Sequence, residues 1–126
     1  QRQMCKETDF TAFDLFELFS AATFSHGRTE DEVMQRHSSI FDCDLLIIDD
    51  LGTEVTNSFV SSQLFLCINE RLMSGKSTII STNLSLEALR DLYSERVFSR
   101  ISSNFQMRKI IGKDIRLLKK LGSKSW

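Results

Sequence analysis

The chain has 126 residues, with 16 basic against 17 acidic side chains and 41% apolar residues. A chain of this length and composition can bury one hydrophobic core without disulfide or metal staples, which excludes disordered and collagen-like proteins. A formal net charge of −1 gives no global electrostatic basis for binding nucleic acid or membranes, so any such contact needs a local patch.

Cysteine usage and the first residues of the chain give further expectations. The cysteines lie far apart and form no Cys-x-x-Cys pair, so we expect reduced core thiols in a cytoplasmic protein rather than a metal site. No apolar run exceeds five residues, far below the ~20 needed to span a bilayer, so we expect no membrane partner. The segment from Gln1 to Glu7 is neither a Met start nor a signal peptide, which predicts a chain truncated at its N-terminus.

The first half of the chain predicts two helices ahead of a buried strand. Apolar residues recur every three or four positions over residues 11–24, and Thr11 stands at the N-cap position. A second, shorter helix is expected over residues 29–37, where capping-box spacing opens it. Residues 44–50 are continuously aliphatic and then abruptly acidic, which is typical of a strand buried on both faces of a parallel sheet. A weaker strand is expected near Met4.

The second half alternates the same two kinds of element. The longest helix is expected over residues 57–74, followed by a β-branched strand over residues 77–83. Helices follow at 85–93 and 94–104, each with a serine at the N-cap position, and a third strand is predicted at 106–111. Strands that alternate with helices indicate a single layered α/β domain over the whole chain.

Polar side chains stand where two of these strands end. They are Asp49-Asp50 and Thr82-Asn83, and ligands of open α/β sheets bind beyond the carboxyl ends of the strands. Aliphatic residues followed by two acids form the Walker B pattern, which presents one carboxylate to hydrated Mg²⁺ and another to an attacking water. The alternative is a simple turn over residues 49–52 after a buried strand. The pattern alone leaves both interpretations open.

Longer stretches carry a more specific resemblance. LLIIDDLGTE spans residues 45–54, ERVFSRI spans 95–101, and IGKDIR spans 111–116. In this order, they resemble the bacterial helicase-loader family of AAA+ ATPases, which includes DnaC, DnaI and the IstB transposition ATPases. The resemblance covers about residues 3–120. It implies a P-loop NTPase of the AAA+ type, a three-layer α/β/α arrangement with a mostly parallel sheet, of which residues 1–126 form one partial domain from Walker B through sensor 2.

The resemblance assigns roles to the polar residues at the strand ends. Asp49 matches the acid that organises Mg²⁺ through water, and Asp50 matches the acid that polarises the attacking water. Asn83, with Thr82 beside it, matches the sensor 1 position that helps to orient water at the γ-phosphate. ATP and Mg²⁺ are therefore the cofactors that the resemblance implies for the intact protein.

The resemblance also assigns roles to arginines in the last third of the chain. Arg100 matches the arginine finger that reaches the nucleotide of a neighbouring subunit, and Arg116 matches the sensor 2 arginine. A guanidinium suits both roles because it stays charged and offers a planar fork to phosphate oxygens. Arg96 lies one helical turn before Arg100, where it either supports the phosphate contact or, as we favour, forms an ordinary surface ion pair.

One part of the family pattern is missing. The phosphate loop G-x-x-x-x-G-K-[ST] does not occur, and the Gly75-Lys76-Ser77 stretch lies after Walker B with Glu70 at the place of the first glycine. We therefore expect this loop upstream of Gln1. Without it, the chain by itself should bind ATP weakly or not at all. Its missing strand would also leave two unpaired strand edges beside the strands at 78–82 and 107–111.

In the intact protein, the resemblance implies ATP binding between self-associated subunits. This ATP binding would control the loading of the replicative DNA helicase onto single-stranded DNA in the cytoplasm. Whether the chain is an enzyme stays open: the intact protein would hydrolyse ATP, and this chain alone would not. The alternatives are an IstB-like transposition helper acting on double-stranded DNA, and a non-catalytic interaction domain derived from the AAA+ fold.

Overall fold

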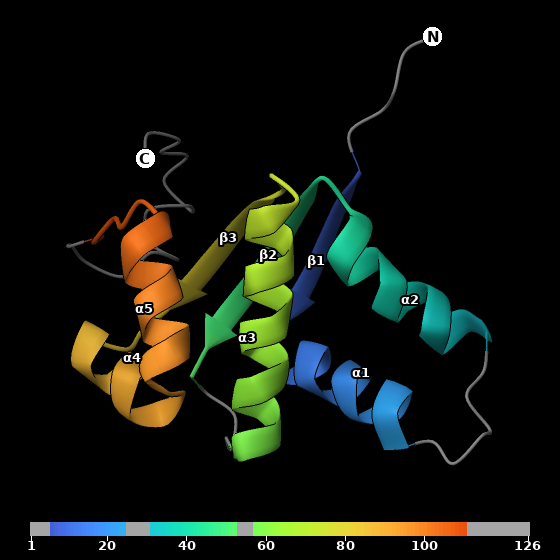
Figure 1. The fold of residues 1–126 in the computed structure, drawn as a ribbon, viewed down its shortest axis with the longest axis horizontal. Coiled ribbons are helices and arrows are strands. Elements are labelled where there is room, and N and C mark those ends of the chain that lie inside the picture. The colour runs from blue at the N-terminus through green and yellow to red at the C-terminus, as the bar shows by residue number, and fades with distance from the viewer. Residues whose placement is uncertain (1–5, 25–30, 53–56, 111–126) are drawn as a thin grey trace, which may run out of the picture.

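The computed structural model describes residues 6–24, 31–52 and 57–110, and Figure 1 shows their arrangement. Within these ranges the elements follow in the order β1, α1, α2, β2, α3, β3, α4, α5. The strands are β1 Glu7–Thr11, β2 Leu45–Leu51 and β3 Ser77–Thr82. The helices are α1 Ala12–Phe24, α2 Asp31–Asp42, α3 Ser58–Met73, α4 Leu86–Leu92 and α5 Glu95–Asn104.

The described strands form one parallel sheet in the order β1-β2-β3. Phe10 of β1 pairs with Ile48 of β2, which pairs in turn with Ile80 of β3. Each return to a parallel neighbour passes through helix, as parallel pairing requires. The predicted α/β class and the parallel sheet are therefore confirmed.

Helices cover one face of this sheet. Leu46 and Ile48 of β2 are fully buried, whereas the alternating residues Leu45 and Ile47 are only half-buried. On β3, Ile79 is 52% exposed on that second face. In Figure 1, α3 crosses the sheet, with α1 and α2 on the side of β1 and α4 and α5 on the side of β3. The described residues thus form two of the three layers that the resemblance implies, and the expected burial of β2 holds for one face.

The core lies between this covered face and the helices. Helices α1, α3 and α5 bury apolar side chains at three- and four-residue spacings, because that spacing places them on one side of the helix. The largest fully buried apolar side chains from the helices are Leu15, Phe19, Ile40, Leu64, Cys67, Ile68 and Val97. Burial raises the pKa of the Cys67 thiol to about 12. Cys43 and Cys67 are free buried thiols, as predicted, while Cys5 lies outside the described residues.

Side-chain caps begin the helices where the sequence predicts. The Thr11 hydroxyl accepts a hydrogen bond from the Asp14 amide at 3.1 Å, and Ser85 and Ser94 cap α4 and α5 in the same manner. Helix α2 is longer than expected: it continues past His37 to Asp42. The extension places Ile40 in the core, where it is fully buried.

The two weaker strand predictions need correction. The strand expected near Met4 lies at Glu7–Thr11, where only Phe10 is buried, so its apolar signal is weak. The strand predicted at 106–111 is wrong over 106–110, which form no ladder with the rest of the described chain. Met107 and Ile110 are 45% and 57% exposed. An apolar extended segment becomes a strand only where a neighbouring strand pairs with it.

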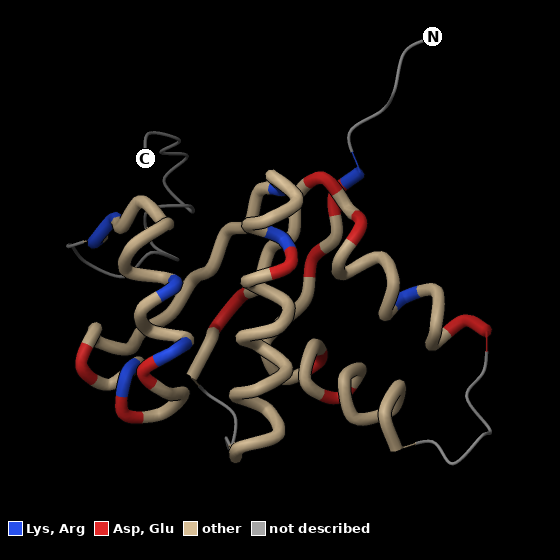
Figure 2. The backbone as a smooth tube through the Cα atoms, in the orientation of Figure 1, with Lys and Arg blue, Asp and Glu red and all other residues tan. Residues whose placement is uncertain are grey.

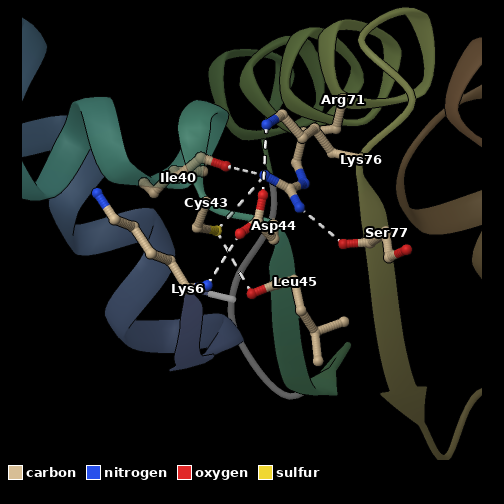
Figure 3. Close-up of polar contacts among 8 residues, drawn as sticks. All are labelled: Lys6, Ile40, Cys43, Asp44, Leu45, Arg71, Lys76 and Ser77. Atoms are coloured by element: carbon tan, nitrogen blue, oxygen red, sulfur yellow. Dashed lines mark hydrogen bonds and ion pairs between the residues drawn. The ribbon is translucent and has the colours of Figure 1, made fainter. Parts of the chain in front are cut away.

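A buried arginine that the sequence analysis did not single out joins α2, α3 and β3 at the amino ends of the strands (Figure 3). Arg71, in the last turn of α3, is 1% exposed. Its Nη1 donates to the Ile40 carbonyl at 2.8 Å, and its Nη2 donates to the Ser77 carbonyl at 2.7 Å. Its Nε donates to the Thr78 hydroxyl at 2.9 Å. These neutral acceptors satisfy the guanidinium in place of a carboxylate.

Candidate functional site

The carboxyl ends of β2 and β3 meet in a small polar cluster. The Ser81 hydroxyl donates to Asp49 Oδ1 and accepts a hydrogen bond from the Asp50 amide at 3.1 Å. Thr82 Oγ1 donates to the Leu51 carbonyl at 2.5 Å. The structure therefore brings together the ends of the two strands that the sequence predicts as one site.

A β-bulge explains why both aspartates face outward. Ile48 pairs with Ile80, but the next pair is Leu51 with Thr82, so two residues of β2 stand opposite Ser81 alone. Strict alternation would place Asp50 on the covered face after Leu46 and Ile48. Instead Asp50 adopts a left-handed φ of 63° and is exposed, as is Asp49, and Leu51 returns to the core. The bulge thus exposes two adjacent carboxylates near the carboxyl end of β2.

Gly52 completes this turn in a conformation that only glycine adopts easily. Its φ is +106°, and an added Cβ would lie 2.4 Å from Leu84 Cδ1. Gly75, after α3, has a φ of +71° but open space around it. We therefore expect Gly52→Ala to lower the free energy of unfolding by about 2–3 kcal/mol, and Gly75→Ala by about 1 kcal/mol.

Urea denaturation measures the free energy of unfolding of both variants. The extra loss in Gly52→Ala relative to Gly75→Ala reports the clash with Leu84. The double variant Gly52→Ala/Leu84→Ala relieves the contact but leaves the backbone strain. Equal losses in the two single variants would show that Leu84 imposes no constraint on this turn.

Ser81 is the member of this cluster that sequence reasoning missed. Its position opposite the bulge depends on the strand register, which no local pattern encodes. Because Ser81→Ala removes both hydrogen bonds to the bulge, we expect it to lower the free energy of unfolding by about 1 kcal/mol. Ser77→Ala in the same strand is the control, since the Ser77 hydroxyl makes no hydrogen bond with the described residues. Equal losses in both variants would contradict the bridging role of Ser81.

The other predicted site residues make no hydrogen bond with this cluster that the structure records among the described residues. Asn83 follows β3 in an exposed bend, next to Thr82. Arg100 lies on α5, where its Cζ is 6.0 Å from the ring centre of Phe65. Arg96, expected to form a surface ion pair, makes none within the described ranges, and its Cζ stacks 4.1 Å from the same ring. Arg116 lies outside the described residues.

The donors at the strand ends fit hydrated Mg²⁺ better than a caged metal. Among the residues that the structure describes, no three His, Cys, Asp or Glu side chains gather as a metal cluster. Magnesium commonly keeps several waters and takes only one or two carboxylates from a protein. Asp49 and Asp50 supply that number of carboxylates, both exposed.

None of the described helices is long and apolar enough to cross a membrane.

Comparison with known proteins identifies the class of the fold. No family model and no curated protein matches the sequence. Solved structures share the fold: two structures of the replication initiator DnaA match with 16% and 17% identity and TM-scores of 0.68 and 0.63. They cover 94% and 97% of this chain, and 37% and 38% of their own. One is bound to AMPPCP and single-stranded DNA, and the other is AMPPCP-bound DnaA from Aquifex aeolicus.

The chain therefore has the fold of the AAA+ proteins. A crystal structure of the DnaC helicase loader matches it with 26% identity and a TM-score of 0.64 over 79% of this chain. These matches confirm the predicted resemblance to a DnaC-like AAA+ domain. The match covers 58% of the DnaC chain, so this chain spans less than two-thirds of the loader that it resembles.

Proposed function

We propose that this chain is the Walker B to sensor portion of an ATP-driven AAA+ protein that loads the replicative helicase onto single-stranded DNA. The observation that carries the proposal is the bulge at the end of β2. It presents Asp49 and Asp50 together, tied through Ser81 to the strand that leads to Asn83. Two outward-facing carboxylates at the carboxyl end of a parallel strand are the arrangement that Mg²⁺-dependent phosphoryl transfer uses.

The carboxylates of Asp49 and Asp50 would have different roles in hydrolysis. Asp49, whose carboxylate accepts a hydrogen bond from the Ser81 hydroxyl, would hold Mg²⁺ through water. Asp50 would accept a hydrogen bond from the attacking water and increase its nucleophilicity, and Asn83 would orient that water. Bound ATP would supply the γ-phosphoryl group, and the accompanying Mg²⁺ would neutralise part of the negative charge of the phosphates.

Arginines from outside the strand ends would complete the site. Arg100 is exposed on α5, with its guanidinium near the Phe65 ring, and an exposed guanidinium suits contact with a nucleotide held by a second copy. Arg116 would contact the nucleotide as the sensor 2 residue. Positive charge that approaches the transferring phosphoryl group stabilises the transition state more than the ground state.

The proposed partners follow from the same likeness. One of the similar structures is the DnaC helicase loader, and one DnaA structure holds single-stranded DNA, so a replicative helicase and single-stranded DNA are the partners that we infer here. Self-association would bring Arg100 of one copy to the nucleotide of the next.

The test uses a completed domain, in which the phosphate-loop strand and helix of a helicase loader are joined ahead of Gln1. We expect single-stranded DNA to stimulate its ATP hydrolysis, and the protein to load a replicative helicase onto circular single-stranded DNA. Stimulation by double-stranded DNA alone, without helicase loading, would favour the transposition helper. Absence of ATP binding in the completed domain would favour the non-catalytic interaction domain.

A further inference from the structure

Phe65 on α3 holds two arginines of α5 at once. The Arg96 guanidinium carbon lies 4.1 Å from the centre of the ring, and that of Arg100 lies 6.0 Å from it. The two arginines are four residues apart, so they project from the same face of α5. In the described part of the chain, each other aromatic ring with such a contact holds a single arginine.

The arginines border a hollow of about 470 Å³ between α3 and α5. Ser99, Ser103, Asn104 and the acidic residue Glu95 also line it. Neither guanidinium has an ion pair with any described residue. Figure 2 shows the basic residues of α4 and α5 on the opposite side of α3 from α1.

Two positively charged guanidiniums beside one aromatic ring favour the binding of an anion. Repulsion between the guanidiniums falls when a negatively charged group binds both, and each planar fork matches a pair of phosphate oxygens. Long arginine side chains lose rotamer freedom when they bind a ligand. A ring that already restricts both side chains reduces that loss, so the aromatic contact increases anion affinity without touching the anion.

We propose that Phe65 is a positioning residue that presents Arg96 and Arg100 together to the phosphate chain of a nucleotide held by a second copy of this chain. This inference rests on the proposed function, because Arg100 is the arginine expected to act across subunits. It adds Arg96 as a second phosphate contact and assigns the aromatic ring the task of fixing both.

The first test is NMR spectroscopy of the whole chain, observing the arginine side-chain Nε–Hε and Cδ–Hδ signals. Because the Arg96 guanidinium carbon lies 4.1 Å from the centre of the Phe65 ring, we expect ring currents to shift the Arg96 proton signals in the native chain. We expect Phe65→Leu to abolish this shift and Phe65→Trp to keep it. Phe98→Leu, which removes the ring beneath Arg90, is the matched control and should leave the Arg96 signals unchanged. Unchanged Arg96 signals in Phe65→Leu would overturn the proposal.

The second test titrates the same proteins with inorganic tripolyphosphate. We expect Phe65→Leu to weaken binding about three- to tenfold, Phe65→Trp to restore it, and Arg96→Ala or Arg100→Ala to weaken it at least as much. Phe65→Met replaces Phe65→Leu if that variant does not fold. Arg90→Ala, which removes an equal charge beside another ring, should bind like the native chain.

Two results would overturn the positioning role: no binding by the native chain, or equal affinity in Phe65→Leu and Phe98→Leu. Failure of the proposed function has a different signature. A completed domain without ATP hydrolysis, together with ring-dependent tripolyphosphate binding, would refute the ATPase and keep the positioning role. Loss of hydrolysis in Arg100→Ala with native behaviour of Phe65→Leu would refute the positioning role alone.

Discussion

Replacing Arg71 by Met should lower the free energy of unfolding by about 2–4 kcal/mol. Methionine fills much of the volume, so the loss reports the hydrogen bonds rather than a cavity. The Ile40 carbonyl would lose a charged donor in a buried site, and the Ser77 carbonyl would lose one in a partly buried site. Urea denaturation followed by circular dichroism measures this loss.

Arg71→Lys tests whether the positive charge at this position is enough for stability or whether the geometry of the guanidinium is also needed. A lysine keeps the positive charge, but its single nitrogen cannot reach acceptors on α2 and β3 in the way that the guanidinium fork does. We expect at least half of the loss to remain. Arg90→Met, on the exposed side of α4, should stay within about 0.5 kcal/mol of the native chain. An Arg71→Met variant as stable as Arg90→Met would contradict the role given to this buried arginine.

Replacing Arg100 by Ala in the completed domain should reduce ATP hydrolysis about 1,000-fold while nucleotide affinity changes less than threefold. The guanidinium is expected to contact the phosphoryl group mainly as charge develops in the transition state, so its removal affects turnover more than binding. Steady-state hydrolysis and fluorescent-nucleotide titration measure the two quantities. Arg90→Ala is the matched control for loss of an exposed arginine.

Mixing two inactive variants tests whether Arg100 acts across subunits. In an equimolar mixture of Arg100→Ala and Asp50→Asn, some interfaces combine an intact Asp50 from one copy with an intact Arg100 from the other. We expect such mixtures to recover hydrolysis well above either variant alone. Full turnover in Arg100→Ala alone would show that the finger assignment is wrong, and no recovery on mixing would show that the arginine acts within its own chain.

The helices and the central strands could be predicted because their signals are local. Capping residues such as Thr11 and Ser85 lie within three residues of the amides that they bind, and the aliphatic run of β2 stands out without reference to other strands. Strand pairing is not local. Residues 106–110 carry a strand-like pattern, but no described strand pairs with them, whereas Glu7–Thr11 pairs with β2 despite a weak pattern.

Among the residues of the candidate site, too, only those with a local sequence signal could be predicted. Asp49 and Asp50 could be predicted because two acids directly after an aliphatic strand form a continuous pattern. Ser81 could not, since its contact with both depends on the bulge and on the parallel register. Arg71 also gave no signal, because a basic residue in the last turn of a helix is ordinarily an exposed partner of the helix dipole.

The central claim is that the bulge at the end of β2 presents the carboxylates of an ATPase. It is tested most directly by ATP binding and hydrolysis in the completed domain with Asp50→Asn, which keeps the size of the side chain and removes its charge. We predict that this variant binds Mg-ATP within about threefold of the parent and hydrolyses it at least about 100-fold more slowly. Hydrolysis at the parent rate would contradict the claim and would make residues 49–52 a simple turn after a buried strand.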